Sequence, residues 1–229
     1  TDSLTGANLN ASFTFTGIVT YAVDSNTAAI TAFEILNGGT QNDAFIFTDG
    51  ATFAGSLNGG LGTDTLDYSL YTTSVVVNLV SGTATGVSNG ISGFENILGG
   101  SANDTLTGDA GSNVITGNAG NDTLTGNDGD DTFVFANGWG TDTVAAGAGQ
   151  DTLDFSAVTS VEPLNVNLAA VDTVTGGSDK VTFSGGDVVI GGQGDDLFTI
   201  HGAQDIDLYG MGGADIFYFV ENGALTGFI

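Results

Sequence analysis

The sequence predicts an all-β protein, in which blocks of a parallel β-roll (a form of β-helix or solenoid) alternate with longer β-strand segments. Two observations favour this fold class. A nine-residue repeat rich in glycine and aspartate recurs along the 229 residues, and such short repeats are typical of chains whose units stack on one another. No stretch shows the 3.6-residue apolar period of an amphipathic helix, and glycine interrupts every window in which one could form.

The clearest repeats occupy residues 99–134, which divide into four consecutive nonapeptides: GGSANDTLT, GDAGSNVIT, GNAGNDTLT and GNDGDDTFV. After a slip of two residues, NGWGTDTVA and AGAGQDTLD continue the pattern. Further copies are GGTQNDAFI at 38–46, GGLGTDTLD at 59–67, GGQGDDLFT at 191–199 and GMGGADIFY at 210–218. The sixth positions of these ten copies are Asp43, Asp64, Asp104, Asn113, Asp122, Asp131, Asp142, Asp151, Asp196 and Asp215.

A longer repeat lies over the short one. DTLDYS at 64–69 recurs as DTLDFS at 151–156, and VVVNL at 75–79 recurs as LNVNL at 164–168. The motif AFEILNGG likewise recurs as GFENILGG at 93–100. Longer apolar strand segments therefore alternate with nonapeptide blocks.

We expect three regions along the chain. Residues 1–98 form a degenerate roll and strand region with isolated repeats, residues 99–156 form the main block, and residues 157–229 form a degenerate C-terminal roll. Within the last region, VDTVTGGSDKVTFSGGDVVI at 171–190 resembles shortened turns. We expect these turns to lie around Asp172, Asp179 and Asp187.

Each nonapeptide has a turn half and a strand half. The first six residues contain the glycines, which permit positive φ and a close approach of the backbone. The last three residues form a short strand in which position eight, occupied by Leu, Ile, Phe or Val, points inward while positions seven and nine point outward. Two nonapeptides complete one coil, so stacked turns lie eighteen residues apart. Asp104 then stacks on Asp122 at one edge, and Asn113 stacks on Asp131 at the other.

This stacking predicts metal sites at the edges of the roll. Each aspartate supplies a carboxylate, and glycine-rich turns leave backbone carbonyl oxygens accessible. A cation between two stacked turns would meet about six oxygens, a coordination that Ca²⁺ accepts at roughly 2.3–2.6 Å. Mg²⁺ demands a smaller and stricter octahedron. Zinc prefers cysteine and histidine, of which this sequence has none and one.

The composition agrees with a bound cation. The chain has 27 acidic residues against one Lys or Arg, for a formal net charge of −26. Such a chain repels nucleic acid and anionic membrane surfaces, so we expect neither as a partner, and no apolar run is long enough for membrane insertion. High acidity often means disorder, but 41% of residues are hydrophobic, which is enough for a core. Without cysteine, a metal is the remaining means of stapling an extracellular chain.

These motifs resemble the hemolysin-type calcium-binding (RTX) family, which includes RTX toxins, secreted proteases and lipases, and bacterial surface-layer proteins. The resemblance is strong over 99–154 and at 59–67, and weaker at 38–46, 191–199 and 210–218. It implies a calcium-bound parallel β-roll, export by type I secretion and folding in external Ca²⁺. It also implies several Ca²⁺ ions held by the sixth-position residues. Asn113 departs from the pattern, so its neutral oxygen should make a weaker site.

The sequence shows no constellation of catalytic residues. It lacks the GxSxG and HExxH motifs of hydrolases, and His201 and Lys180 are the only histidine and the only basic residue. We therefore expect no enzymatic activity in this segment. Two functions stay open: a structural protein of the bacterial cell surface or extracellular matrix (a surface layer, filament or adhesin segment), or the C-terminal secretion and folding module of an enzyme or toxin.

The ends of the segment lead to one more expectation. TDSLTG at the start reads like the tail of a nonapeptide, and ENGALTGFI at the end is apolar and has no polar cap. Open ends of a roll expose apolar strand and unpaired backbone groups. We expect them to meet head to tail, so that the protein self-associates into a calcium-dependent polymer or lattice. A contact with cell-surface polysaccharide does not follow from the sequence.

Overall fold

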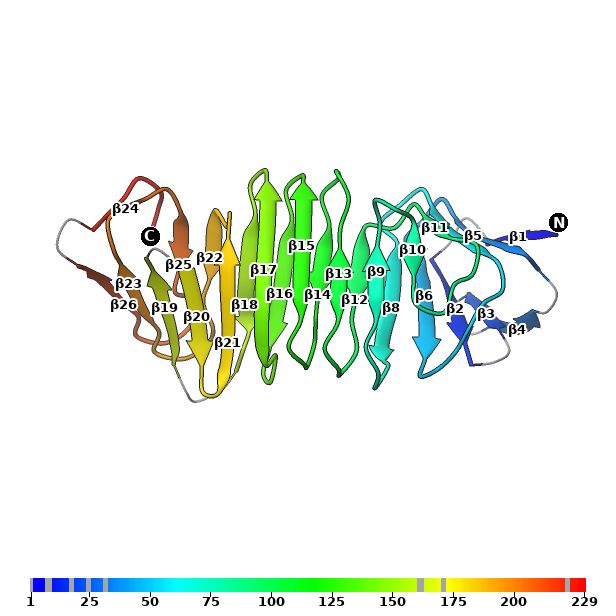
Figure 1. Cartoon of the computed structure of the whole chain (residues 1–229), viewed down its shortest axis with the longest axis horizontal. Coiled ribbons are helices and arrows are strands. Elements are labelled where there is room, and N and C mark those ends of the chain that lie inside the picture. The colour runs from blue at the N-terminus through cyan, green and yellow to red at the C-terminus, as the bar shows by residue number, and fades with distance from the viewer. Residues whose placement is uncertain are drawn as a thin grey trace.

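The computed structural model of the chain describes residues 2–6, 10–16, 19–23, 26–30, 33–159, 163–169, 172–220 and 223–229. Within these ranges the chain is all-β, with most strands paired in parallel, as the sequence predicts. Figure 1 shows an elongated molecule whose strands lie across its long axis, with the N-terminal segment at one end and the C-terminal segment at the other. The described residues include no helix that could cross a membrane.

Two long sheets form the two faces of the roll. The eleven-stranded sheet has the order β25-β22-β18-β16-β14-β12-β8-β6-β2-β3-β4. Its strands are β2 (Ala11–Phe15), β3 (Val19–Val23), β4 (Asn26–Ile30), β6 (Ala44–Thr48), β8 (Thr65–Leu70), β12 (Asn96–Leu98), β14 (Val114–Thr116), β16 (Thr132–Ala136), β18 (Thr152–Ala157), β22 (Val188–Ile190) and β25 (Asp207–Tyr209).

The ten-stranded sheet has the order β10-β9-β13-β15-β17-β21-β20-β19-β23-β26. Its strands are β9 (Val76–Asn78), β10 (Thr83–Ala84), β13 (Thr105–Thr107), β15 (Thr123–Asp128), β17 (Thr141–Ala148), β19 (Leu164–Leu168), β20 (Asp172–Gly176), β21 (Asp179–Ser184), β23 (Leu197–Ile200) and β26 (Ile216–Phe219).

Two smaller sheets complete the fold. One has four strands in the order β1-β5-β7-β11, namely β1 (Ser3–Thr5), β5 (Ile35–Gly39), β7 (Ser56–Gly60) and β11 (Ile91–Ser92). The other pairs β24 (Ala203–Gln204) with β27 (Ala224–Leu225).

The register of the main block follows the nonapeptide. Thr105 pairs with Thr123 in one sheet and Val114 pairs with Thr132 in the other, so two repeats make one coil of eighteen residues. The two-residue slip after residue 134 lengthens the next coil to twenty residues. The predicted stacking is therefore confirmed for this block.

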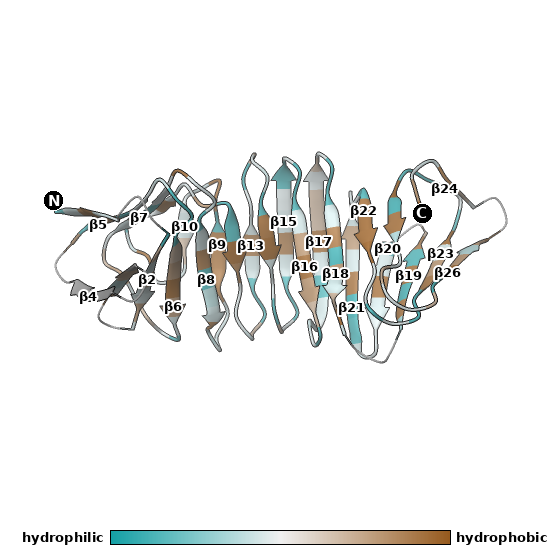
Figure 2. Ribbon diagram, turned by 180° about the vertical axis from the view of Figure 1, so that it is seen from behind, coloured by the Kyte–Doolittle hydropathy of each residue, from teal (hydrophilic) through white to brown (hydrophobic). Residues whose placement is uncertain are grey.

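Position eight of each repeat builds the core. Leu106, Ile115, Leu124 and Phe133 have no exposed surface, whereas the flanking positions are partly or fully exposed. Aromatic rings stack along the roll axis in the same way, as in Phe15 on Phe47 at 4.1 Å between ring centroids. Figure 2 shows brown apolar residues in the strands and mostly pale to teal residues in the turns. Alternation along each short strand thus separates core from surface.

One expectation for the C-terminal region is wrong. Residues 172–184 do not form shortened turns of the roll, because β20 runs antiparallel to both of its neighbours, β19 and β21. The two-residue turn Gly177–Ser178 joins β20 to β21, with Gly177 at φ +59°. A two-residue turn with glycine between alternating segments favours a hairpin over a crossover. Asp172 and Asp179 therefore lie on hairpin strands, whereas Asp187 precedes the parallel strand β22.

Candidate metal sites in the turns

The ten sixth-position residues line up in two columns, one at each edge of the roll. Each residue comes just before, or at the start of, a strand of a long sheet, so the pairing of that sheet sets their spacing. The first column, beside the eleven-stranded sheet, contains Asp43, Asp64, Asn113, Asp131 and Asp151. The second column, beside the ten-stranded sheet, contains Asp104, Asp122, Asp142, Asp196 and Asp215.

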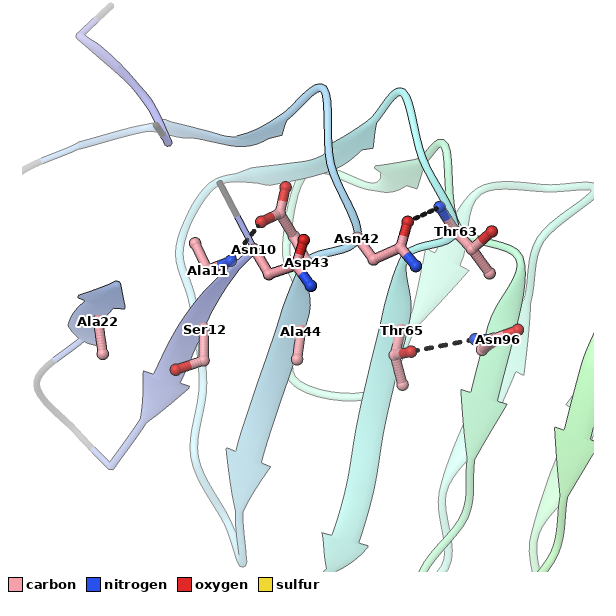
Figure 3. A pocket seen from close by; sticks show the side chains of 10 residues that line it. All are labelled: Asn10, Ala11, Ser12, Ala22, Asn42, Asp43, Ala44, Thr63, Thr65 and Asn96. Atoms are coloured by element: carbon pink, nitrogen blue, oxygen red, sulfur yellow. Dashed lines mark hydrogen bonds between the residues drawn. The ribbon is translucent and has the colours of Figure 1, made fainter. Parts of the chain in front are cut away.

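A ladder of hydrogen bonds runs along each column. The Oδ1 atom of Asp122 accepts the backbone N–H of Asp104 at 2.8 Å, and Oδ1 of Asp142 accepts that of Asp122 at 2.8 Å. The same bond joins Asp131 to Asn113. Figure 3 shows how the carboxylate of Asp43 reaches back in this way to the N–H of Ala11. Each carboxylate therefore leans toward the preceding coil and helps to hold it.

The second carboxylate oxygen, Oδ2, is the notable atom. In six of these residues it is buried and has no hydrogen-bond partner: Asp43, Asp64, Asp122, Asp131, Asp142 and Asp151. A buried carboxylate oxygen without a donor is costly to the folded state. A cation between the coils would remove that cost, so the arrangement fits a metal site.

Glycine at position one makes room for this oxygen. A Cβ atom on Gly117 would contact Oδ2 of Asp122, and one on Gly59 would lie 2.6 Å from Oδ2 of Asp64. The same conflict recurs at Gly38, Gly99, Gly108, Gly126, Gly191 and Gly210 with the sixth-position residue of their own turn. In these eight repeats, glycine at position one thus leaves room for the side chain five residues later; Asn137 and Ala146 occupy this position before Asp142 and Asp151.

The structure adds to the first column two residues that belong to none of the ten nonapeptides. The Oε2 atom of Glu95 accepts the N–H of Asp64 at 2.7 Å, and Oδ2 of Asp187 accepts that of Asp151 at 3.0 Å. Neither lies in a regular nonapeptide. The signal for Glu95 was its position eighteen residues before Asn113, the spacing of one coil.

Position five carries a second ladder that sequence reasoning missed. The Oδ1 atom of Asn103 accepts the N–H of Asn121, and Oδ1 of Asn121 accepts the N–H of Thr141, both at 3.0 Å. In the same way, the Oδ1 atom of Asp130 accepts the N–H of Gln150 at 2.8 Å. These side chains reach forward to the next coil, opposite to those at position six. The recurrence of Asn or Asp directly before the sixth-position residue was the available signal.

Burial changes the acidity of the columns. Desolvation raises the pKa of Asp64, Asp122 and Asp131 from 3.8 to about 6, and that of Asp142 to about 7. The ladder hydrogen bonds oppose this rise, and neighbouring carboxylates add to it: Asp104 acts on Asp122, and Asp122 acts on Asp142. Ionising these groups at neutral pH is therefore unfavourable unless positive charge lies close by.

The donor set favours calcium. Among the described residues, no three acidic, histidine or cysteine side chains converge on one point, so backbone carbonyls must complete any coordination shell. Such carbonyls are present: the positions where Gly120 and Gly129 would carry Cβ lie 2.5 Å from the oxygen of Ala102 and 2.6 Å from that of Gly111. A few carboxylate oxygens with several carbonyls suit Ca²⁺ and provide none of the nitrogen or sulfur that zinc prefers.

Comparison with known families agrees with this geometry. Residues 98–133, 137–154 and 169–198 match the RTX calcium-binding nonapeptide repeat, in four copies. The chain carries calcium-binding RTX repeats. The comparison with curated proteins found no match to this sequence. RTX repeats in general bind calcium and are structural, and proteins that carry them are typically exported by type I secretion; the match therefore supports a calcium-binding protein of the extracellular type in general.

The structure extends the RTX geometry beyond the matched residues. Asp43 and Asp64 lie N-terminal to the matches, yet they share the ladder bond and the buried outer oxygen of Asp122. Asp215 lies C-terminal to them and accepts the N–H of Asp196 at 3.0 Å. The assignment of individual residues as calcium ligands is a prediction from this shared geometry.

The glycine requirement can be tested with one pair of variants. Gly117→Ala would place Cβ against Oδ2 of Asp122, so we expect the calcium-bound chain to lose about 1–3 kcal/mol of stability. The calcium concentration at the folding midpoint should rise accordingly in a circular dichroism titration.

Gly111→Ala is the matched control. Its nearest atom would be Oδ1 of Asp109 at 3.3 Å, and Gly111 is not among the residues with positive φ. The midpoint of this variant should stay close to that of the wild type. Equal shifts in both variants would contradict the proposed role of Gly117.

Lowering the pH should allow the chain to fold partly without calcium. Because the folded-state pKa values of the buried aspartates lie above the unfolded value, protonation favours the folded chain. This contribution is fully present below about pH 4 and is lost as the pH rises through about 6 to 7. A rise of two pKa units corresponds to about 3 kcal/mol for each group. We expect metal-free protein to gain β-structure in far-ultraviolet circular dichroism as the pH falls from about 8 to 4.

Asp142→Asn provides the comparison for the acid titration. This variant removes the carboxyl whose pKa is raised to about 7. One proton fewer is then needed for folding, so the acid-induced folding transition of the metal-free variant should move to higher pH. A metal-free chain that loses β-structure on acidification would contradict the prediction.

Proposed function

We propose that this chain is a calcium-dependent structural segment of the bacterial cell surface or extracellular matrix, which folds when it meets external Ca²⁺. The observation that carries the proposal is the set of six buried outer oxygens without a partner. Calcium bound between the coils would satisfy them, and the same ions would offset part of the formal charge of −26. Because the sites exist only when the coils are stacked, binding free energy becomes folding free energy.

The extent of the roll favours a structural role over a catalytic one. The described residues from Ser3 to Leu225 are spread over strands and turns of this one stack, and the hydrophobic core runs through it from Ala11 to Leu208. Its turns carry carboxylates in ladders rather than an acid and a base facing one substrate. We therefore propose that the segment has no enzymatic activity and that secretion places it outside the cell.

A second candidate function stays compatible with the same roll. The segment could be the secretion and folding module of an enzyme or toxin, since RTX repeats occur in such proteins as well. The sequence of the full-length gene separates the two proposals. A catalytic or toxin domain on the same chain would favour the module, and further repeats would favour the surface protein.

We also propose that the calcium-bound protein self-associates. The strand β26 is the last strand of the ten-stranded sheet, and Ile216 and Tyr218 on it are 60% and 59% exposed. Phe219 and the nearby segment with Phe228 and Ile229 add further exposed apolar surface. An exposed, apolar edge strand is a template for pairing with another chain, and a second copy of this chain brings its own strand edges. Such a contact between unlike ends produces filaments or lattices.

The calcium requirement is tested by circular dichroism. At neutral pH we expect a largely disordered spectrum in excess EGTA and a β-rich spectrum at millimolar Ca²⁺, because the outer oxygens are satisfied only in the second state. The change should be reversible on adding chelator. A β-rich spectrum that survives excess EGTA would reject calcium-dependent folding.

Self-association is tested by light scattering of the calcium-loaded protein. Ile216→Lys introduces a charge on the edge strand β26 and should reduce the assembly size. Val80→Lys is the control, because Val80 is 68% exposed but lies outside the strands. The proposal fails if the wild type is a monodisperse monomer at millimolar Ca²⁺, or if both variants assemble alike.

A further inference from the structure

Nine of the ten turns have one of two backbone conformations. In the turn of Asp122, Asn118 at position two and Gly120 at position four have φ of +66° and +137°. The turns of Asp64, Asp131, Asp142, Asp151 and Asp215 also have positive φ at both positions. We call these open turns. The turn of Asp43 has positive φ at position two alone, at Gly39.

Three turns are different. In the turns that end at Asp104, Asn113 and Asp196, neither position two nor position four has a positive φ. We call these closed turns. Their sequences, GGSAND, GDAGSN and GGQGDD, contain as many glycines as several open turns, so glycine content does not separate the two classes.

The two conformations present different groups to the outer side-chain atom of position six. In closed turns the N–H of position two bonds back to it: Gly100 to Oδ2 of Asp104 at 2.6 Å, and Gly192 to Oδ2 of Asp196 at 2.8 Å. Asp109 bonds to Oδ1 of Asn113 at 2.8 Å in the same way. All six buried outer oxygens without a partner belong to other turns. An N–H donor therefore stands in the closed turns where the other turns need a cation.

The closed turns also share a place in the roll. Behind Asp104 and Asp196 lie Val75 and Leu164, which donate their N–H groups to these carboxylates. Val75 and Leu164 begin the two copies of the longer repeat, VVVNL and LNVNL, which lack a glycine turn. Behind Asn113 lies Glu95, and the Asn113 amide donates to its carbonyl oxygen at 3.2 Å. No closed turn therefore follows a regular nonapeptide turn on its own edge.

An open turn follows each closed turn on the same edge. Asp104 donates its N–H to Asp122, Asn113 donates to Asp131, and Asp196 donates to Asp215. The carboxylate of the open turn leans back toward the closed turn. Carbonyl oxygens of the closed turn lie close to the open turn: a Cβ on Gly120 would lie 2.5 Å from the oxygen of Ala102, and one on Gly129 would lie 2.6 Å from that of Gly111. A closed turn can thus contribute carbonyl oxygens to an ion while its own position-six side chain is already satisfied.

We propose that calcium is bound through the carboxylates of the six turns with unpartnered outer oxygens, and that Asp104, Asn113 and Asp196 do not bind calcium through their side chains. The side chains of these three turns are satisfied without a metal ion. Each of the three turns comes before an open turn on the same edge, and that open turn stacks on it. This inference rests on the proposed calcium-dependent folding. It divides residues that share one position of the repeat into two chemical roles.

The test counts calcium ions bound per chain, by equilibrium dialysis against Ca²⁺ followed by metal analysis. Aspartate-to-asparagine variants keep one oxygen for the ladder and replace the other with an amide. Asp122→Asn and Asp151→Asn should each lose at least one bound ion relative to the wild type. Asp104→Asn and Asp196→Asn should keep the wild-type number, and Asn113→Asp should not add an ion.

Circular dichroism at saturating Ca²⁺ checks that each variant is folded. If Asp122→Asn does not fold, Asp64→Asn in the first column gives the same comparison. Loss of an ion in Asp104→Asn or Asp196→Asn, or gain of one in Asn113→Asp, would overturn the inference and leave calcium-dependent folding intact. A wild-type chain that binds no calcium would instead reject the proposed function itself.

Discussion

The rest of this structure depends on carboxylates that are buried at the edges of the roll with one oxygen bonded and the other without a protein partner. The bonded oxygen joins two coils, because it accepts an N–H from the coil behind it, as between Asp122 and Asp104. The other oxygen is satisfied only if a cation enters the stack. One side chain thus links the pairing of the sheets to the binding of metal. Under the proposed function, folding and calcium binding are therefore coupled.

Several positions of the nonapeptide make contacts that join one coil to the next. Glycine at position one leaves space for the outer oxygen, as Gly117 does for Asp122. Position five reaches forward and position six reaches backward, as Asn121 does to Thr141 and Asp122 does to Asp104. Position eight fills the core. Each coil is therefore held by the coils on both sides, which is the nearest-neighbour stability expected of a solenoid.

The antiparallel hairpin of β20 and β21 interrupts the carboxylate ladder at one edge of the roll. The hairpin of β20 and β21 enters the ten-stranded sheet between β17 and β19, and among the described residues no carboxylate continues the hydrogen-bond ladder of the second column from Asp142 to Asp196. Strand pairing alone maintains the sheet there, as Thr143 pairs with Thr182 and Val166 with Val174. On the opposite face the first column continues without interruption from Asp151 to Asp187. The insertion therefore divides one metal-binding edge while leaving the other continuous.

The sequence by itself determined the length of a coil in the main block and which positions of the repeat point inward. The spacing of Asp104, Asp122 and Asp131, with Leu106 and Leu124 two residues after an aspartate, was enough to predict the eighteen-residue coil of the main block, the inward positions and the stacked sixth-position residues of that block. Their periodicity is a local property, since each nonapeptide contains its own turn glycines and its own strand.

Only the tertiary structure decided which turns are open and which are closed. GGQGDD at Asp196 and GGLGTD at Asp64 have similar sequences but different φ angles. They also lie on different neighbours: a segment without a glycine turn behind Asp196, and the turn of Asp43 behind Asp64. The place of Glu95 in the first column and the direction of β20 likewise follow from strand pairing. Each of these features depends on contacts between coils, and a residue's neighbours in the stack are distant from it in the sequence.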